Sequence, residues 1–180
     1  MMSFFLFALV AVFAGAIGSS TDYAEEGVPP RLAHTREEFS FVVRAPYERT
    51  FPLFGAYEER KWAAGFDPQF LFPSSPHDQQ GMVFTTVQEG HTRWWTNTAF
   101  DSATGHVQYV YFIADTMVAL IDIHLTKTAA AETQVDVVYE RTALNSQANE
   151  QVVQMASIDA GSGPRWAAMI NGYFQAAGAK

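Results

Sequence analysis

The chain has no cysteine among its 180 residues. This absence excludes disulfide bonds, thiolate nucleophiles, cysteine-linked lipid anchors and cysteine-based zinc or iron–sulfur sites, and it leaves the redox compartment open. Basic residues are also few: 11 Lys and Arg stand against 19 Asp and Glu, for a formal net charge of -8. Nucleic acid and anionic membrane surfaces are therefore poor partners, because no basic cluster offsets the repulsion from their phosphates.

Catalytic motifs are missing as well. The sequence has no Gly-x-Ser-x-Gly turn, no glycine-rich phosphate loop and no His-Glu-x-x-His helix. His91 with Arg93, and Asp122 with His124, lie two residues apart on expected strands, so each pair shares a face. Neither pair has an evident third ligand, whereas zinc usually takes three or four, so we expect solvated surface there. The sequence indicates no catalytic residue, no metal site and no cofactor.

An uncharged apolar segment at residues 4–17 is typical of an export signal. It is too short to span a bilayer comfortably, and residues 14–16 have the small-x-small form of a cleavage site. We therefore expect a signal peptide over 1–20, a linker over 21–35 and a periplasmic or secreted domain over 36–178, with no stable membrane span after cleavage. No Lys or Arg precedes the apolar segment. Two alternatives thus stay open: an uncleaved N-terminal membrane anchor, and a start codon placed too far upstream.

Hydrophobic residues make up 48% of the chain and charged residues 17%, which fits one globular domain. Alternation predicts a strand over 38–45, ended by Pro46, and a loosely helical apolar stretch from Phe51 to Trp62 follows. Residues 66–80, with three prolines, are expected to form a loop. Turn signals then separate five strands at about 82–88, 91–100, 106–113, 117–125 and 132–143.

The end of the chain predicts a buried helix. Asn145 or Ser146 can cap it, and Trp166, Met169, Ile170, Tyr173 and Phe174 recur at the spacing of one apolar helical face. The Gly-Ser-Gly-Pro run at 161–164 should kink or break this helix.

Turn lengths predict the register of the strands, and opposed residues share a face. The predicted pairs include Phe84 with Trp95, Trp95 with Tyr111, Asn97 with Tyr109, Tyr109 with Ile121, Ile123 with Val135, Ile121 with Val137 and Ala119 with Tyr139. One face then collects Met82, Phe84, Arg93, Trp95, Asn97, Tyr109, Tyr111, Met117, Ala119, Ile121, Ile123, Val135, Val137 and Tyr139. The other face is polar along the last two strands, with Asp122, His124, Gln134, Asp136 and Glu140. The first face is thus expected to be concave and covered by the helix, although a two-residue turn after Ile113 would swap the faces of the last two strands.

One set of short segments forms a known pattern: residues 41–51, Trp62 within 61–65, residues 81–84, Trp95 with Asp101, Tyr109, residues 133–142 and Trp166. Together these segments resemble the START-like superfamily, also called SRPBCC or polyketide cyclase-like. The likeness spans about residues 37–176. It implies an α+β helix-grip fold, in which a curved antiparallel sheet wraps around a long C-terminal helix and two short helices follow the first strand. It also implies binding of a lipid, quinone, polyketide or other hydrophobic molecule between the sheet and that helix.

Candidate ligand-binding residues follow from the concave face and from the resemblance. They are Trp62, Phe66, Phe84, Arg93, Trp95, Asn97, Tyr109, Tyr111, Met117, Ile121, Tyr139, Met155, Trp166 and Ile170. Core packing is the alternative role for these aromatic and methionine side chains, and Arg93 could instead reach solvent at the rim. Strand parity allows Arg141 to point inward, but it stands near the end of its strand, so a salt bridge at the rim is expected for it. The main function hypothesis is binding of a hydrophobic or amphipathic small molecule. A cyclase-like or dehydratase-like enzyme that uses the same cavity and a ligand-free interaction module are the alternatives, and oligomeric state has no sequence signal.

Overall fold

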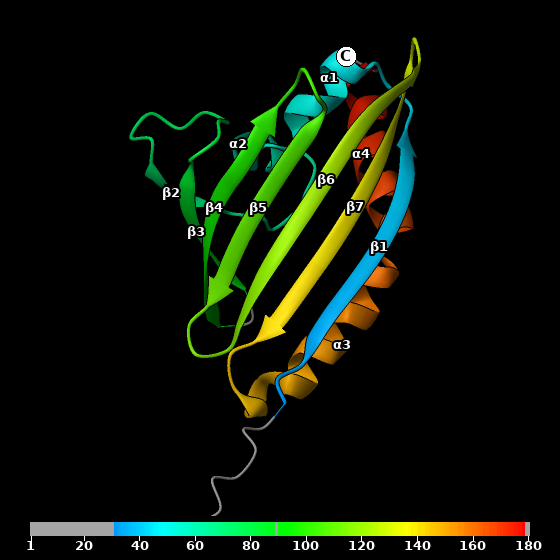
Figure 1. Ribbon diagram of the computed structural model, residues 1–180. Helices are drawn as coiled ribbons and strands as arrows, with labels where there is room; N and C mark the ends of the chain where they lie inside the picture. Colours follow the sequence, from blue (N-terminus) through cyan, green and yellow to red (C-terminus); the bar gives the residue numbers. More distant parts are fainter. Residues whose placement is uncertain (1–30, 89, 179–180) are drawn as a thin grey trace, which may run out of the picture.

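The computed structural model describes residues 31–88 and 90–178 (Figure 1). The expected signal peptide and most of the expected linker lie outside these residues, so both stay predictions. Within the described part of the chain, no helix combines the length and the apolar character needed to cross a membrane.

Seven antiparallel strands form one curved sheet in the order β1-β7-β6-β5-β4-β3-β2 (Figure 1). The strands are β1 (His34–Val43), β2 (Gln69–Phe72), β3 (Val83–Gln88), β4 (His91–Asp101), β5 (His106–Ile113), β6 (Met117–Ala129) and β7 (Glu132–Ala143). From β2 to β7, each strand pairs with the strand that follows it in the sequence. Strand β1 pairs with β7 and forms one edge of the sheet. The predicted antiparallel α+β architecture is confirmed.

The short edge strand β2 lies where the sequence predicts only loop. Phe70 of β2 pairs with Phe84 of β3, and the register shifts between Phe70 and Phe72. Pro68 and Pro73 flank this four-residue strand. Prolines on both sides of a short segment are typical of loops. They are also tolerated beside an edge strand of a sheet, where few ladder hydrogen bonds are lost. The sequence pattern therefore does not predict this strand.

Short helices follow β1, as predicted: α1 (Tyr47–Thr50), η1 (Phe51–Phe54) and α2 (Ala56–Glu59). The C-terminal part comprises η2 (Ser146–Ala148), α3 (Asn149–Ala160) and α4 (Ser162–Gly178). Asn145 caps this part through its side-chain oxygen, which accepts a hydrogen bond of 3.0 Å from the Ala148 amide. The expected break is confirmed, because Gly161 separates α3 from α4, and both helices lie along the same side of the sheet near β1 (Figure 1).

The predicted register is confirmed through β6. Phe84 pairs with Trp95, Trp95 with Tyr111, and Tyr109 with Ile121. The predicted pairing of β6 with β7 is wrong by two residues. The pairs found there are Ile123 with Val137, Ile121 with Tyr139 and Ala119 with Arg141. The hairpin extends to Ala129 and Glu132 with a bulge after Lys127, so its turn lies further along the chain than expected. A shift of two keeps every side chain on its predicted face.

The concave face carries the core, as predicted. The residues predicted for this face are buried, apart from the half-buried Arg93, Trp95 and Tyr139. The polar residues Asp122, His124, Gln134, Asp136 and Glu140 lie on the convex face and are half-buried or exposed.

Trp166 of α4 joins the final helix to this face. Its ring lies 5.5 Å from Phe39 and 6.2 Å from Phe41 of β1, and 6.4 Å from Tyr139 of β7, as measured between ring centroids. It also lies 5.7 Å from Trp62, which follows α2. Edge-to-face aromatic pairs stabilise packing beyond the area they bury. One side chain therefore holds the helix, the sheet and the α2 segment together.

We predict that Trp166→Ala lowers the free energy of unfolding by at most about 3–5 kcal/mol, the usual cost of removing a large aromatic side chain from a core, because Trp166 is half-buried. Trp94→Ala is the matched control. Trp94 is 43% exposed on the convex face and stacks on Phe112 of the neighbouring strand, so its loss should cost about 1 kcal/mol or less. Urea unfolding followed by circular dichroism measures both; equal losses would contradict the role of Trp166.

Candidate ligand cavity

A cavity with two adjoining chambers lies between the concave face, the α2 segment and the two C-terminal helices. The inner chamber has a volume of about 50 Å³, and its lining is Phe54, Glu59, Trp62, Phe66, Phe84, Trp95, Tyr109, Ile121, Ile123, Tyr139 and Trp166. The outer chamber has a volume of about 400 Å³. It shares Glu59, Trp62, Phe66, Trp95, Tyr139 and Trp166 with the inner chamber and adds Ala63, Ala64, Gly65, Gln88, Arg93, Arg141, Met155, Ile158, Asp159, Ser162, Arg165 and Met169.

The outer chamber opens to solvent. Gly65, Ile158 and Arg165 at its border are exposed. Ile158 and Arg165 flank the break between α3 and α4, so this break forms part of the mouth of the cavity. The interrupted final helix therefore shapes the entrance.

Two hydrogen bonds from aromatic side chains fix one wall of the inner chamber. The Trp62 indole Nε1 donates to the Leu53 carbonyl at 2.7 Å, and the Tyr109 hydroxyl donates to the Phe54 carbonyl at 3.0 Å. Both acceptors belong to the short helix η1, whose last carbonyls have few partners of their own. Burial raises the pKa of Tyr109. Its hydroxyl thus stays protonated near neutral pH and serves as a structural donor.

Glu59 is the acidic group that lines both chambers, and the start of α2 positions it. The Asp78 carboxylate accepts hydrogen bonds from the backbone amides of Tyr57, at 2.7 Å, and Glu58, at 3.2 Å. A Cβ at Gly55 would overlap this carboxylate, so glycine is needed there for the close approach. Asp78 from the proline-rich loop therefore caps the turn that carries Glu59 into the cavity.

The surroundings of Glu59 favour its neutral form. Burial and, to a smaller extent, the negative charge of Asp78 raise the pKa of Glu59 from 4.5 to about 8. The carboxyl group is half-buried by surface area, but it borders the cavity rather than open solvent. No residue in the described ranges contributes a hydrogen bond that lowers this pKa. At neutral pH the group is therefore largely a protonated acid that is available to an occupant of the cavity.

A buried ion pair joins β7 to α3 beside the outer chamber. Arg141 Nη2 lies 2.9 Å from the Asp159 carboxylate, and Arg141 Nη1 donates to the Tyr111 hydroxyl at 3.3 Å. Only 4% of the Arg141 side chain is exposed, so the expected salt bridge is present but buried rather than at the rim, and Arg141 points inward as strand parity allows. The strand continues beyond Arg141 to Ala143, which keeps the arginine inside. Burial raises the pKa of Asp159 to about 6 although Arg141 opposes this shift.

Arg93 of β4 also lies near Tyr111. The guanidinium carbons of Arg93 and Arg141 are 5.5 Å and 5.9 Å from the centre of the Tyr111 ring. Within the described part of the chain, the buried Nε atoms of both arginines have no hydrogen-bond partner. Unpartnered buried donors are unusual in native proteins and call for an explanation. These two atoms point to a polar acceptor that the chain itself does not supply.

The predicted ligand residues divide into two groups. Ten line the cavity: Trp62, Phe66, Phe84, Arg93, Trp95, Tyr109, Ile121, Tyr139, Met155 and Trp166. Asn97, Tyr111, Met117 and Ile170 are fully buried in the core and border neither chamber. For all the residues in both groups, contact with a ligand stays a prediction.

Sequence reasoning missed Glu59 and Asp159. Glu59 lies in a stretch without clear periodicity, and its inward position depends on the Asp78 cap. Asp159 is a lone acidic residue two positions before a helix break. Its one sequence signal is its place one helical turn after Met155 on α3, and this signal is weak.

We predict that Glu59 makes the protein less stable as the pH rises. The folded state keeps a proton up to about pH 8 that the unfolded state releases near pH 4.5. The free energy of unfolding should therefore fall between these values, by at most about 1.4 kcal/mol per pH unit. Glu59→Gln removes this contribution, so the variant should match the wild type near pH 4.5 and exceed it at pH 8. Urea unfolding over a pH series tests this; parallel curves for the two proteins would refute it.

Comparisons with known proteins agree with the geometry. Neither a protein-family model nor a curated protein matches the chain. Among solved structures, norcoclaurine synthase from Thalictrum flavum, in complex with dopamine and hydroxybenzaldehyde, is similar with a TM-score of 0.57 and 12% identity over 83% of this chain and 90% of that one. Ara h 8.0201 matches with a TM-score of 0.54 and 16% identity over 80% and 99% of the two chains. An uncharacterized protein from Rhizobium leguminosarum matches with a TM-score of 0.56 and 10% identity over 81% and 97%.

These identities are low, so the likeness concerns the fold. Curved antiparallel sheet, short helices after the first strand and C-terminal helix recur in the same arrangement. The chain therefore has a helix-grip fold, the architecture that the sequence resemblance implied.

Proposed function

We propose that this protein binds an amphipathic small molecule, with its apolar body in the cavity and an anionic end at Arg93 and Arg141. The observation that carries the proposal is the pair of buried, unpartnered Nε atoms beside a chamber of about 400 Å³. Small-molecule sites are typically apolar clefts of roughly 300–1,000 Å³ with a few convergent polar groups. A chamber of this size also favours ligand binding over the alternative of a cavity filled by its own side chains.

The apolar part of the ligand has an aromatic surface to contact. Trp62, Trp95 and Trp166 line both chambers, with Phe84 and Ile121 deeper in the inner one. The inner chamber has room for only a few waters or a small group, given about 10–15 Å³ of such volume for each water. A ligand body is therefore expected in the outer chamber with one narrow part directed inward.

The charge around the outer chamber supports an anionic end. Arg93, Arg141 and Arg165 face it, against the ionised Asp159 and a largely neutral Glu59. The chamber is thus locally positive although the chain as a whole carries a formal charge of -8. Guanidinium groups bind carboxylates, sulfonates and phosphates through paired hydrogen bonds.

The ligand class therefore narrows to lipid-like, quinone-like or polyketide-like molecules that bear an acidic group. A solved protein of the same fold is described in complex with two small aromatic molecules, dopamine and hydroxybenzaldehyde, which supports a small organic ligand. Native mass spectrometry of the protein from its own host would identify any such molecule.

We predict that the anionic probe anilinonaphthalene sulfonate binds more tightly than the neutral probe N-phenylnaphthylamine. Arg93→Gln should weaken binding of the anionic probe about tenfold or more, because a charge-assisted hydrogen bond is worth about 1.5–3 kcal/mol. Binding of the neutral probe should change less than about twofold. Probe fluorescence measures both affinities.

Arg36→Gln is the matched control for this experiment, since Arg36 lies on the outer strand β1 and pairs with Glu140 away from the cavity. It should leave both affinities unchanged. Equal effects of Arg93→Gln on the two probes would reject the anionic end but keep the apolar site. Failure of both probes to bind the wild type would reject the cavity as a binding site.

A second candidate function is catalysis, and the position of Glu59 favours it. A carboxyl group with a pKa of about 8 inside a cavity is suited to donate or accept a proton at neutral pH. The tyrosines are less suited to ionise, because burial raises the pKa of Tyr109, Tyr111 and Tyr139. An enzyme of this kind would transfer a proton at a carbonyl compound, as in cyclisation or dehydration.

We predict that, if catalysis occurs, Glu59→Gln retains a molecule that the wild type does not. The amide keeps the shape of the acid but cannot exchange a proton, so the substrate should accumulate in the cavity of the variant. Wild type and variant purified from the same host, followed by solvent extraction and mass spectrometry of the released molecules, make the comparison. The same released molecule from both proteins would favour a carrier.

A further inference from the structure

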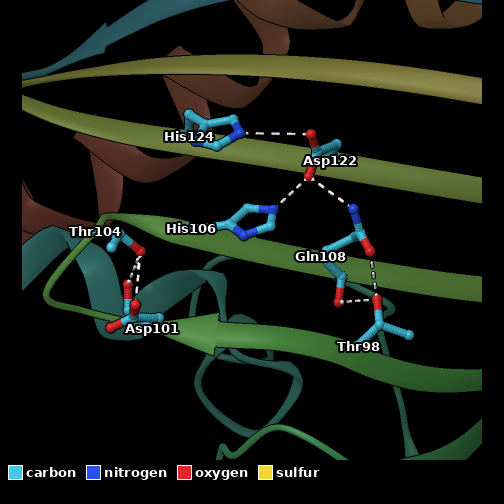
Figure 2. Close-up of polar contacts among 7 residues, drawn as sticks. All are labelled: Thr98, Asp101, Thr104, His106, Gln108, Asp122 and His124. Carbon is cyan, nitrogen blue, oxygen red and sulfur yellow. Dashed lines mark hydrogen bonds and ion pairs between the residues drawn. The ribbon is translucent and has the colours of Figure 1, made fainter.

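The convex face of the sheet carries a cluster of metal-binding side chains, on the side opposite to the cavity. His106 of β5 lies directly opposite His124 of β6, and Gln108 lies opposite Asp122. Figure 2 shows both imidazole rings directed at the Asp122 carboxylate. The sequence offers Asp122 and His124 without a third ligand. The pairing of β5 with β6 supplies that ligand as His106.

The distances within the cluster fit one small cation. His106 Nε2 lies 2.6 Å from Asp122 Oδ1, and His124 Nε2 lies 3.4 Å from Asp122 Oδ2. The two imidazole rings are parallel, with 4.6 Å between their centres. One ligand atom from each of the three residues lies within 4.8 Å of the others. Two ligands of a tetrahedral zinc ion are about 3.3 Å apart, from bonds of about 2.0–2.1 Å. Small rotations of the three side chains would bring their ligand atoms to this separation of about 3.3 Å.

A chain of hydrogen bonds holds the carboxylate in place. Gln108 Nε2 donates to Asp122 Oδ1 at 3.1 Å, and the Thr98 hydroxyl donates to Gln108 Oε1 at 2.8 Å (Figure 2). Thr98, Gln108 and Asp122 come from the three adjacent strands β4, β5 and β6. Metal-binding carboxylates are commonly oriented by such neighbours. The cluster therefore has a rigid support as well as three ligands.

We propose that His106, Asp122 and His124 bind one divalent transition-metal ion, with zinc as the expected occupant. Imidazole nitrogen suits zinc, copper and nickel, whereas calcium and magnesium prefer sites made only of oxygen. The His124 side chain is 54% exposed. The ion can thus enter from solvent, and water completes its coordination.

The position of the site gives it a structural effect. The ion links β5 to β6, the strand whose residues Ile121 and Ile123 line the inner chamber on the opposite face. A ligand that binds the folded state but not the unfolded state raises stability by mass action. Zinc should therefore raise the melting temperature, and a chelator should reverse the rise.

Calorimetric titration of the protein, prepared without a polyhistidine tag, with zinc chloride tests the proposal. The expected result is one ion per chain, with an affinity that falls about tenfold or more in His106→Gln and in His124→Gln. Gln108→Leu should weaken binding by about tenfold, as is typical for groups that orient a metal ligand. His91→Gln is the control: His91 is an exposed histidine of β4 outside the cluster, and its loss should leave the affinity unchanged.

Cobalt substitution gives a second readout that does not depend on stability. Wild-type protein with cobalt should show a visible absorption band that His106→Gln lacks, with circular dichroism confirming that both proteins are folded. Unchanged zinc affinity in His106→Gln, or no saturable binding by the wild type, overturns the proposal.

Discussion

The packing of Trp166 against the concave face is the interaction on which the rest of the structure depends. A curved sheet leaves more space beneath it than one helix fills, and the residual space is the cavity. Trp166 bridges this space by touching Phe39 and Tyr139 of the sheet and Trp62 of the α2 segment. The same indole is thus both a support for the fold and a wall of the ligand chambers. Stability and cavity shape cannot be varied independently at this position.

Polar groups are distributed unevenly along the cavity. The inner chamber is aromatic and aliphatic apart from Glu59, whereas the outer chamber has the ion pair of Arg141 with Asp159 and the free edge of Arg93. A buried ion pair seldom adds net stability, because desolvation offsets most of the attraction. Its effect here is positional: it joins α3 to β7 next to the mouth, on one side of the break at Gly161. The entrance is therefore polar and fixed, and the interior is apolar.

The sequence predicts the architecture well and the site only in part. Strict alternation gave the faces of β3 to β7, and even the two-residue error between Ile123 and Val137 left those faces intact, because the side-chain period is two. Aromatic cavity residues such as Trp95 were found for the same reason. Glu59 was missed, since its inward position depends on a cap supplied by Asp78 about twenty residues later along the chain. His106 was missed as a metal ligand because only strand pairing brings it beside Asp122.

The alternation of β4 has a spectroscopic consequence. Trp94 and Trp95 are neighbours in sequence but lie on opposite faces of the sheet, and Trp62 and Trp166 join Trp95 around the cavity. Three of the four tryptophans of the chain therefore surround one chamber, with Trp62 and Trp166 only 5.7 Å apart. Indoles this close couple their electronic transitions, so the near-ultraviolet dichroism of the protein should change when a ligand enters the cavity. The tryptophans of the cavity can therefore report the binding of a ligand through circular dichroism, without any added label.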